Sequence, residues 1–221
     1  MTPANGPTVS KAKKVALIAA PWVLLLTTYL AFQGAVALLG PRPGYLAGFL
    51  FYWIAWCLAF PLWILGREGV AARFRDRQPR FTSRKWLGLL LLLLPLLLAY
   101  GYEFPRVLPQ ATVPIVLASA AISVVNGVAE ELLWRGTYAS AFPGSAWWGY
   151  LYPALGFAVW HFSPQSVFPN PRPGAAVSLV VAAGIVGLMW GWVVFRTKSV
   201  RWTTLSHILF DFSGLGGRVY F

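Results

Sequence analysis

Long apolar runs separated by short polar breaks dominate the chain. A transmembrane helix needs about 20 apolar residues; six runs are of about that length or longer, and a seventh is shorter. The runs cover approximately 15–39, 45–65, 86–102, 112–142, 146–162, 175–195 and 202–213. The first is too long for a signal-peptide core and no Ala-x-Ala site follows it, which predicts an uncleaved span. The pattern predicts an all-α, polytopic membrane protein with about seven transmembrane helices.

The polar breaks also indicate how the chain is organised. Residues 1–14 form a predicted polar cytoplasmic tail, and 15–111 form N-terminal transmembrane helices with a basic cytoplasmic loop at 66–85. Residues 112–213 form a second, helical core, and a Gly-rich tail follows at 214–221.

Composition supports the membrane assignment. Of the 221 residues, 58% are hydrophobic and 11% are charged, whereas a soluble domain carries about 25% charged residues. A soluble protein of this size still exposes roughly 30% of the surface its chain could expose, and this chain lacks the polar residues to cover it. The single cysteine, Cys57, excludes a disulfide within the chain and a cysteine-based zinc site.

The net charge of +12 reflects membrane orientation rather than nucleic-acid binding. Lys and Arg gather in the breaks between apolar runs, which is the positive-inside pattern. With the N-terminus in the cytoplasm, thirteen basic residues lie in predicted inside segments and four in outside segments. The bias predicts a multi-pass protein of the bacterial cytoplasmic membrane, with membrane lipid as a partner and nucleic acid excluded.

Ionisable residues inside the apolar runs are the candidate functional groups. Three of the six acidic residues and both histidines lie within predicted spans or at their ends. These are Glu130, Glu131, Asp211, His161 and His207. Such groups cost several kcal/mol at membrane depth, so a functional role is the default interpretation. The alternative is a buried salt-bridge network that fixes helix packing.

Spacing predicts that these groups converge. Glu130 precedes the turn at Pro143–Gly144 by about 13 residues and His161 follows it by about 17, so an antiparallel hairpin places both at similar depth. His207 and Asp211 are four residues apart and share a helix face. We therefore expect one cavity between the fourth, fifth and seventh spans.

The residue types indicate hydrolysis. Glu131 and Arg135 have the i, i+4 spacing of an ion pair, which leaves Glu130 free to act as a general base. Asn126, one turn earlier, either holds Glu130 by a hydrogen bond or packs against another helix. Together with the histidines, this set suits activation of water and stabilisation of an oxyanion, or a divalent metal held through N and O ligands.

Three short motifs on successive apolar runs contain these residues. They are EExxxR at Glu130–Arg135, FxxxH at Phe157–His161 and HxxxD at His207–Asp211. With these motifs the sequence resembles the CPBP family, which comprises type II CAAX prenyl endopeptidases and bacteriocin-processing proteases and is also called the Abi family. The resemblance implies a catalytic core over 112–213 that cleaves peptide bonds at or in the membrane.

The resemblance also implies a role for each residue. Glu130 would activate water with His161 as its partner, His207 and Asp211 would face the oxyanion, Glu131 and Arg135 would orient the site, and Phe157 would form an apolar wall. The family is described both as glutamate-type and as metal-dependent, so the expected cofactor is either none or a divalent metal such as zinc.

Asp211 bears on the choice between a glutamate-type and a metal-dependent site, because asparagine is commoner at this position of the family's third motif. An ionised Asp cannot donate to an oxyanion but is a good metal ligand. A metal would be held by Glu130, His161, His207 and Asp211. These residues lack the HExxH spacing that preforms a zinc site, which favours the glutamate-type alternative.

Two other functions remain open at this stage. A proton-coupled transporter also buries Glu, His and Asp, but the chain shows no inverted repeat. A non-catalytic membrane scaffold would be indicated by loss of Glu130 or of either histidine, and all are present. For a protease, the expected substrate is a protein or peptide with a membrane-associated, leader or tail segment.

Overall fold

The computed structural model describes residues 9–75, 85–169 and 174–221, and in these residues it contains helices and no strand. The α-helices are α1 (Lys11–Leu39), α2 (Pro41–Phe51), α3 (Phe60–Ala71), α4 (Lys85–Leu98), α5 (Phe104–Val107), α6 (Val113–Glu130), α7 (Tyr138–Ala141), α8 (Tyr152–Trp160), α9 (Phe162–Gln165), α10 (Ala175–Thr197) and α11 (Arg201–Ser213). Wider π-helical stretches join or precede them at Tyr52–Ala59, Ala99–Glu103, Glu131–Thr137 and Trp147–Leu151. Short 3₁₀ turns lie at Leu108–Gln110 and Gly216–Tyr220.

Five continuous helices in the described residues are long and apolar enough to cross a membrane. They are Lys11–Leu39, Pro41–Ala71, Lys85–Gln110, Val113–Ala141 and Ala175–Thr197. The runs at 146–162 and 202–213 also form helix, but α8 and α11 are short: α11 has 13 residues, about 20 Å at 1.5 Å per residue. The all-helical fold is therefore confirmed, while the count of seven spans stays a prediction.

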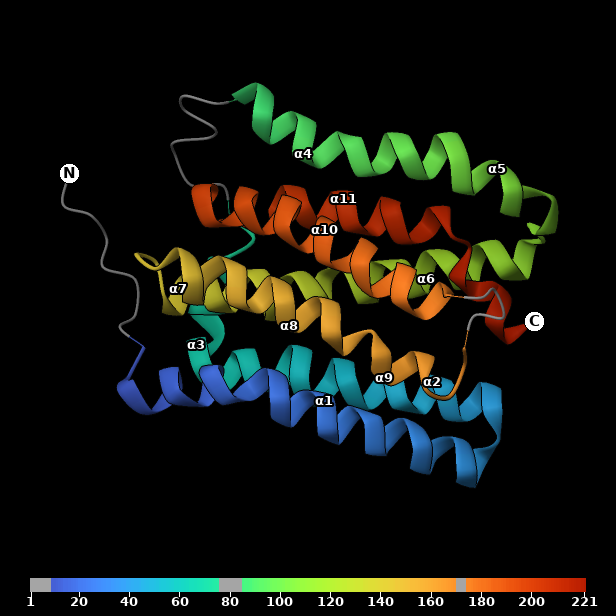
Figure 1. Cartoon of the computed structure of the whole chain (residues 1–221), viewed down its shortest axis with the longest axis horizontal. Helices are drawn as coiled ribbons and strands as arrows, with labels where there is room; N and C mark the ends of the chain where they lie inside the picture. The colour runs from blue at the N-terminus through green and yellow to red at the C-terminus, as the bar shows by residue number, and fades with distance from the viewer. Residues whose placement is uncertain (1–8, 76–84, 170–173) are drawn as a thin grey trace.

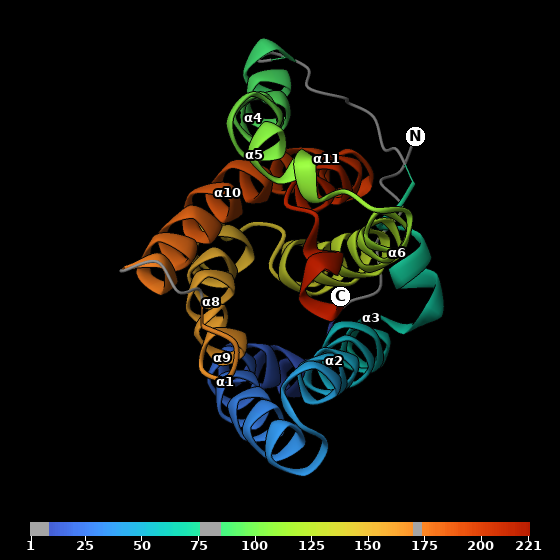
Figure 2. The same ribbon diagram turned by 90° about the vertical axis from the view of Figure 1, so that its right-hand side faces the viewer.

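The helices lie along one common direction and form tiers (Figure 1). In both views α4 lies at one side of the molecule and α1 with α2 at the other, while α6, α8, α10 and α11 lie between them (Figures 1 and 2). Each of these four central helices packs against at least one of the others. The central helices belong to residues 112–213, where the sequence places the candidate site.

The corner between α1 and α2 shows how local sequence sets the fold. Gly40 has a φ of 85°, a left-handed conformation that ends α1. Pro41 follows at the first position of α2, where its missing N–H costs nothing. A Cβ on Gly44 would lie 2.4 Å from the Cα of Val36, so glycine allows α2 to pack directly on α1.

The basic segments at residues 11–14, 67–75 and 196–201 gather at one end of the helices, on the left in Figure 1. The Arg73 guanidinium donates to the carbonyl of Lys198 at 3.4 Å, and the Val200 N–H donates to the carbonyl of Arg73 at 2.8 Å. Lys13 Nζ donates to the carbonyl of Ile64 at 3.1 Å. Residues 76–84 of the predicted basic loop lie outside the described residues.

Candidate active site

The two adjacent acids lie where α6 passes into a π-helical stretch. Glu130 ends α6 and Glu131 begins the stretch Glu131–Thr137. The side chains of both acids are buried, with relative exposures of 1% and 0%. Insertions of this kind into an α-helix are rare and frequently occur at functional sites.

Glu130 is held by three side chains from three different segments. The Tyr52 hydroxyl donates to its Oε1 at 3.0 Å, and the Asn126 amide donates to its Oε2 at 3.1 Å. His207 Nε2 lies 3.4 Å from the same Oε2. The expected bond from Asn126 is therefore present.

Glu131 forms the expected ion pair with Arg135. Arg135 Nη1 lies 3.1 Å from Glu131 Oε1, and both side chains are buried. His207 Nδ1 also lies 3.1 Å from Glu131 Oε1. The Arg135 guanidinium lies 4.0 Å from the centre of the Phe157 ring.

His207 and Asp211 come from α11 and complete the cluster. His207 Nε2 lies 3.5 Å from Asp211 Oδ1, and the Asn126 amide donates to Asp211 Oδ2 at 2.9 Å. The orientation of the Asn126 amide follows from Trp53, whose indole N–H donates to Asn126 Oδ1 at 2.9 Å. Asn126 therefore links Glu130 to Asp211, in addition to packing against a second helix.

His161 is hydrogen-bonded within its own helical segment. Its Nδ1 lies 2.7 Å from the Phe157 carbonyl, and because a carbonyl only accepts, Nδ1 carries the hydrogen and Nε2 has a free lone pair in the neutral ring. In the described part of the chain, no hydrogen bond or ion pair joins His161 to Glu130. The imidazole in contact with Glu130 belongs to His207, and the role of His161 as the partner of Glu130 stays a prediction.

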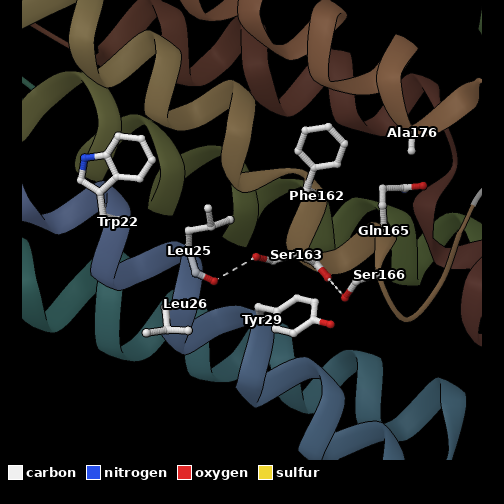
Figure 3. A pocket seen from close by; sticks show the side chains of 9 residues that line it. All are labelled: Trp22, Leu25, Leu26, Tyr29, Phe162, Ser163, Gln165, Ser166 and Ala176. Atoms are coloured by element: carbon white, nitrogen blue, oxygen red, sulfur yellow. Dashed lines mark hydrogen bonds between the residues drawn. The ribbon is translucent and has the colours of Figure 1, made fainter.

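Ring packing and helix α1 hold His161 in place. The imidazole packs edge-on against Phe157, with ring centres 4.7 Å apart. The next residues turn into α9, where the Thr28 hydroxyl donates to Ser163 Oγ at 3.1 Å and Ser163 Oγ donates to the Leu25 carbonyl at 3.4 Å. Figure 3 shows this last contact at the edge of a mainly apolar pocket of about 520 Å³ between α1 and α9.

A second pocket reaches the acid cluster at Asp211. It has a volume of about 540 Å³ and lies between α4, α10 and α11. Its lining is mostly apolar and includes Leu94, Leu98, Ile185, Met189 and Phe210, and Asp211 is one of its few polar residues. The Asp211 side chain is 25% exposed, whereas those of Glu130, Glu131 and His207 are 4% exposed or less.

The donor set does not fit a divalent metal in this arrangement. Among the described residues, no group of three or more His, Cys, Asp or Glu side chains is placed to hold an ion. Both nitrogens of His207 already face carboxylate oxygens, and His161 Nδ1 is bound to a carbonyl. A zinc site needs about four ligands in tetrahedral geometry, and these side chains do not converge in that way.

Three contributors to the site were not foreseen from the sequence. Tyr52 and Trp53 come from the second long helix, and Trp134 donates from its indole N–H to the Tyr52 hydroxyl at 2.8 Å. A polar-tipped aromatic in the middle of an apolar run is the one available signal. It is weak here, because the chain contains 12 Trp and 9 Tyr.

Comparison with known families agrees with the motifs. Residues 112–213 match the family model described as Type II CAAX prenyl endopeptidase Rce1-like. This stretch contains all three motifs, so the family match and the motifs indicate the same family of CAAX-type intramembrane proteases. Searches of curated proteins and of solved structures return no match.

Proposed function

We propose that the protein is an intramembrane endopeptidase in which Glu130 activates the water that attacks a peptide bond. The observation that carries the proposal is the environment of Glu130, a buried carboxylate held by Tyr52, Asn126 and His207 within a family-matched core. A buried carboxylate held by several donors is a preorganised general base.

In the proposed reaction Glu130 takes a proton from water, and the resulting hydroxide attacks the carbonyl carbon of the peptide bond. The free Nε2 of His161 accepts a hydrogen bond from the second hydrogen of that water, which stays on the oxygen, so His161 orients the water without touching Glu130. Glu130 then passes its proton to the leaving nitrogen as the C–N bond breaks. The products are a carboxylic acid and an amine; the acid passes its proton to the amine, and Glu130 returns to its ionised starting state.

We place the oxyanion on the side of His207 and Asp211. Asp211 is the most exposed acid of the cluster, and it can donate to an oxyanion only while it carries a proton. His207 bridges Glu130, Glu131 and Asp211 and keeps the three acids in a fixed relation. The Glu131–Arg135 ion pair anchors this arrangement to the helix that carries Glu130.

The pocket beside Asp211 supports a substrate with an apolar, membrane-associated part. Its lining from α4 and α10 is mostly apolar and ends at the acid cluster. We propose that this pocket takes the apolar flank of a protein or peptide substrate while the scissile bond lies at Glu130. A prenylated tail and an unmodified apolar segment both fit this chemistry.

We further propose a seven-span topology with a cytoplasmic N-terminus and the site between the fourth, fifth and seventh spans. Support comes from the basic segments, which meet at one end of the helices through Arg73 and Lys198. Reporter fusions after residue 80 test the orientation: cytoplasmic signals are expected, and external signals would overturn it.

The experiment that tests the function is cleavage by purified protein in liposomes. Fluorogenic peptides with an apolar C-terminal segment, with and without a farnesylated cysteine, serve as probes. Proteomics of a deletion strain then identifies natural substrates as precursors that keep a terminal segment. Cleavage of neither peptide and no retained precursor would point to a scaffold or a transporter.

A further inference from the structure

Tyr52 lies at the start of the π-helical stretch Tyr52–Ala59. Its hydroxyl forms a hydrogen bond with a residue of another helix. Its side chain is fully buried. Its hydroxyl lies 3.0 Å from Oε1 of Glu130, which is 78 residues away in the chain.

The direction of this hydrogen bond follows from a second contact. The Trp134 indole N–H lies 2.8 Å from the Tyr52 oxygen, and an indole nitrogen donates but does not accept. Trp134 therefore occupies a lone pair of the Tyr52 oxygen, and the hydroxyl hydrogen is directed to Glu130. The three residues form a chain of two hydrogen bonds: Trp134 donates to Tyr52, and Tyr52 donates to Glu130.

The Tyr52 ring is fixed as well as its hydroxyl. It stacks on the ring of Trp160, with centres 3.9 Å apart and planes 17° apart. Trp160 immediately precedes His161 in the chain. Tyr52 therefore connects the segment that carries Glu130 to the segment that carries His161.

The contacts of Glu130 leave a position open on its Oε1 oxygen. An ionised carboxylate has about four acceptor sites, two on each oxygen. On Oε2, Asn126 donates to one site, and His207 Nε2 lies 3.4 Å from the same oxygen. On Oε1, Tyr52 occupies one, and the remaining site is the one available to a water molecule.

We propose that Tyr52 is the positioning residue of the general base. Its hydroxyl fixes Oε1 of Glu130 so that the remaining lone pair of that oxygen faces the attacking water. Trp134 acts through Tyr52 by fixing the direction of the hydroxyl. This inference rests on the proposed function and adds the residue that aims the base.

The test compares Tyr52→Phe with a matched control, Tyr138→Phe, on the fluorogenic peptides in liposomes. Tyr138 is equally buried, and its hydroxyl donates to the Leu17 carbonyl at 2.9 Å instead of to an acid. Both variants keep the aromatic ring and lose one buried hydrogen bond, so a general loss of stability affects both.

We expect Tyr52→Phe to lower kcat by about 10- to 100-fold, because a misdirected catalytic group loses that much rate, with KM changed less than about twofold. Tyr138→Phe should keep the wild-type kcat. Trp134→Phe should lower kcat less than Tyr52→Phe, and the double variant should be no slower than Tyr52→Phe alone, since Trp134 acts through the hydroxyl that is already missing.

The outcomes separate the inference from the proposed function. An active wild type whose kcat is retained in Tyr52→Phe, or falls equally in Tyr138→Phe, would overturn the positioning role and leave the protease function standing. An additive double variant would also overturn it. A wild type that cleaves neither peptide, together with a deletion strain that retains no precursor, would overturn both.

Discussion

Gly127 of α6 lies directly against Ile208 of α11. A Cβ on Gly127 would lie 2.8 Å from Ile208 Cγ1 and 3.0 Å from the Ile208 backbone nitrogen. The neighbours of these two residues in the chain are Asn126 and His207, which belong to the acid cluster. The absence of a side chain at Gly127 therefore allows the two halves of the candidate site to meet.

We predict that Gly127→Ala lowers activity and that Gly127→Val abolishes it. The added carbons must push α11 away from α6, and overpacking of this kind costs about 1–3 kcal/mol. The cleavage rate should fall by more than the loss of folded protein explains. The reason is that Asn126 then loses contact with Asp211, and Glu130 with His207. Peptide cleavage and thermal unfolding, measured on the same preparations, check this.

Gly34→Ala is the matched control, since a Cβ at Gly34 meets nothing within 4 Å. It should keep full activity and gain up to about 1 kcal/mol, because alanine is a better helix residue than glycine. Ile208→Ala combined with Gly127→Ala should recover part of the loss. Full activity of Gly127→Val would show that this close approach is not needed.

Arg135→Leu should destabilise the fold together with the activity. It leaves Glu131 as a buried charge without its cation, and breaking a buried pair costs about 3–5 kcal/mol. Arg135→Met combined with Glu131→Gln removes both charges and should restore much of the thermal stability but not the activity. A stable and fully active Arg135→Leu protein would show that the ion pair has no role.

Asp211→Asn distinguishes the two mechanisms. If the site is glutamate-type, the introduced asparagine can still accept from Asn126 and can donate to an oxyanion without needing a proton. Activity should then be kept or raised and should extend to higher pH than in the wild type. Cleavage rates of both proteins against pH, with and without a chelator, provide the measurement. Lost activity that excess metal restores would instead identify Asp211 as a metal ligand.

The sequence predicted the acid cluster better than its surroundings. Ionisable side chains in apolar runs are rare enough to stand out, and their i, i+4 spacing correctly predicted the Glu131–Arg135 pair. Tyr52 was not predicted, because nothing in the sequence distinguishes it from the other aromatic residues of the spans. Its contact with Glu130 depends on how two helices are rotated and on the π-helical stretch that begins at Tyr52.

The position of His161 shows a second limit. The rise per residue along a hairpin estimates depth in the membrane, but it does not give the direction in which a side chain points. His161 Nδ1 donates to the Phe157 carbonyl, and the imidazole in contact with Glu130 is that of His207. The sequence also did not settle the number of spans: α11 is helical as expected, its 13 residues are fewer than a typical span, and the seventh span stays a prediction.

The central claim is that Glu130 is the general base of a peptidase, and Glu130→Gln tests it most directly. Glutamine keeps the size of the side chain and its acceptor oxygen but cannot take a proton from water. Cleavage of the fluorogenic peptides by this variant should fall at least about 100-fold while its thermal unfolding stays close to that of the wild type. Glu68→Gln, at an exposed acid near the basic end, should cleave at the wild-type rate. Undiminished cleavage by Glu130→Gln would contradict the account.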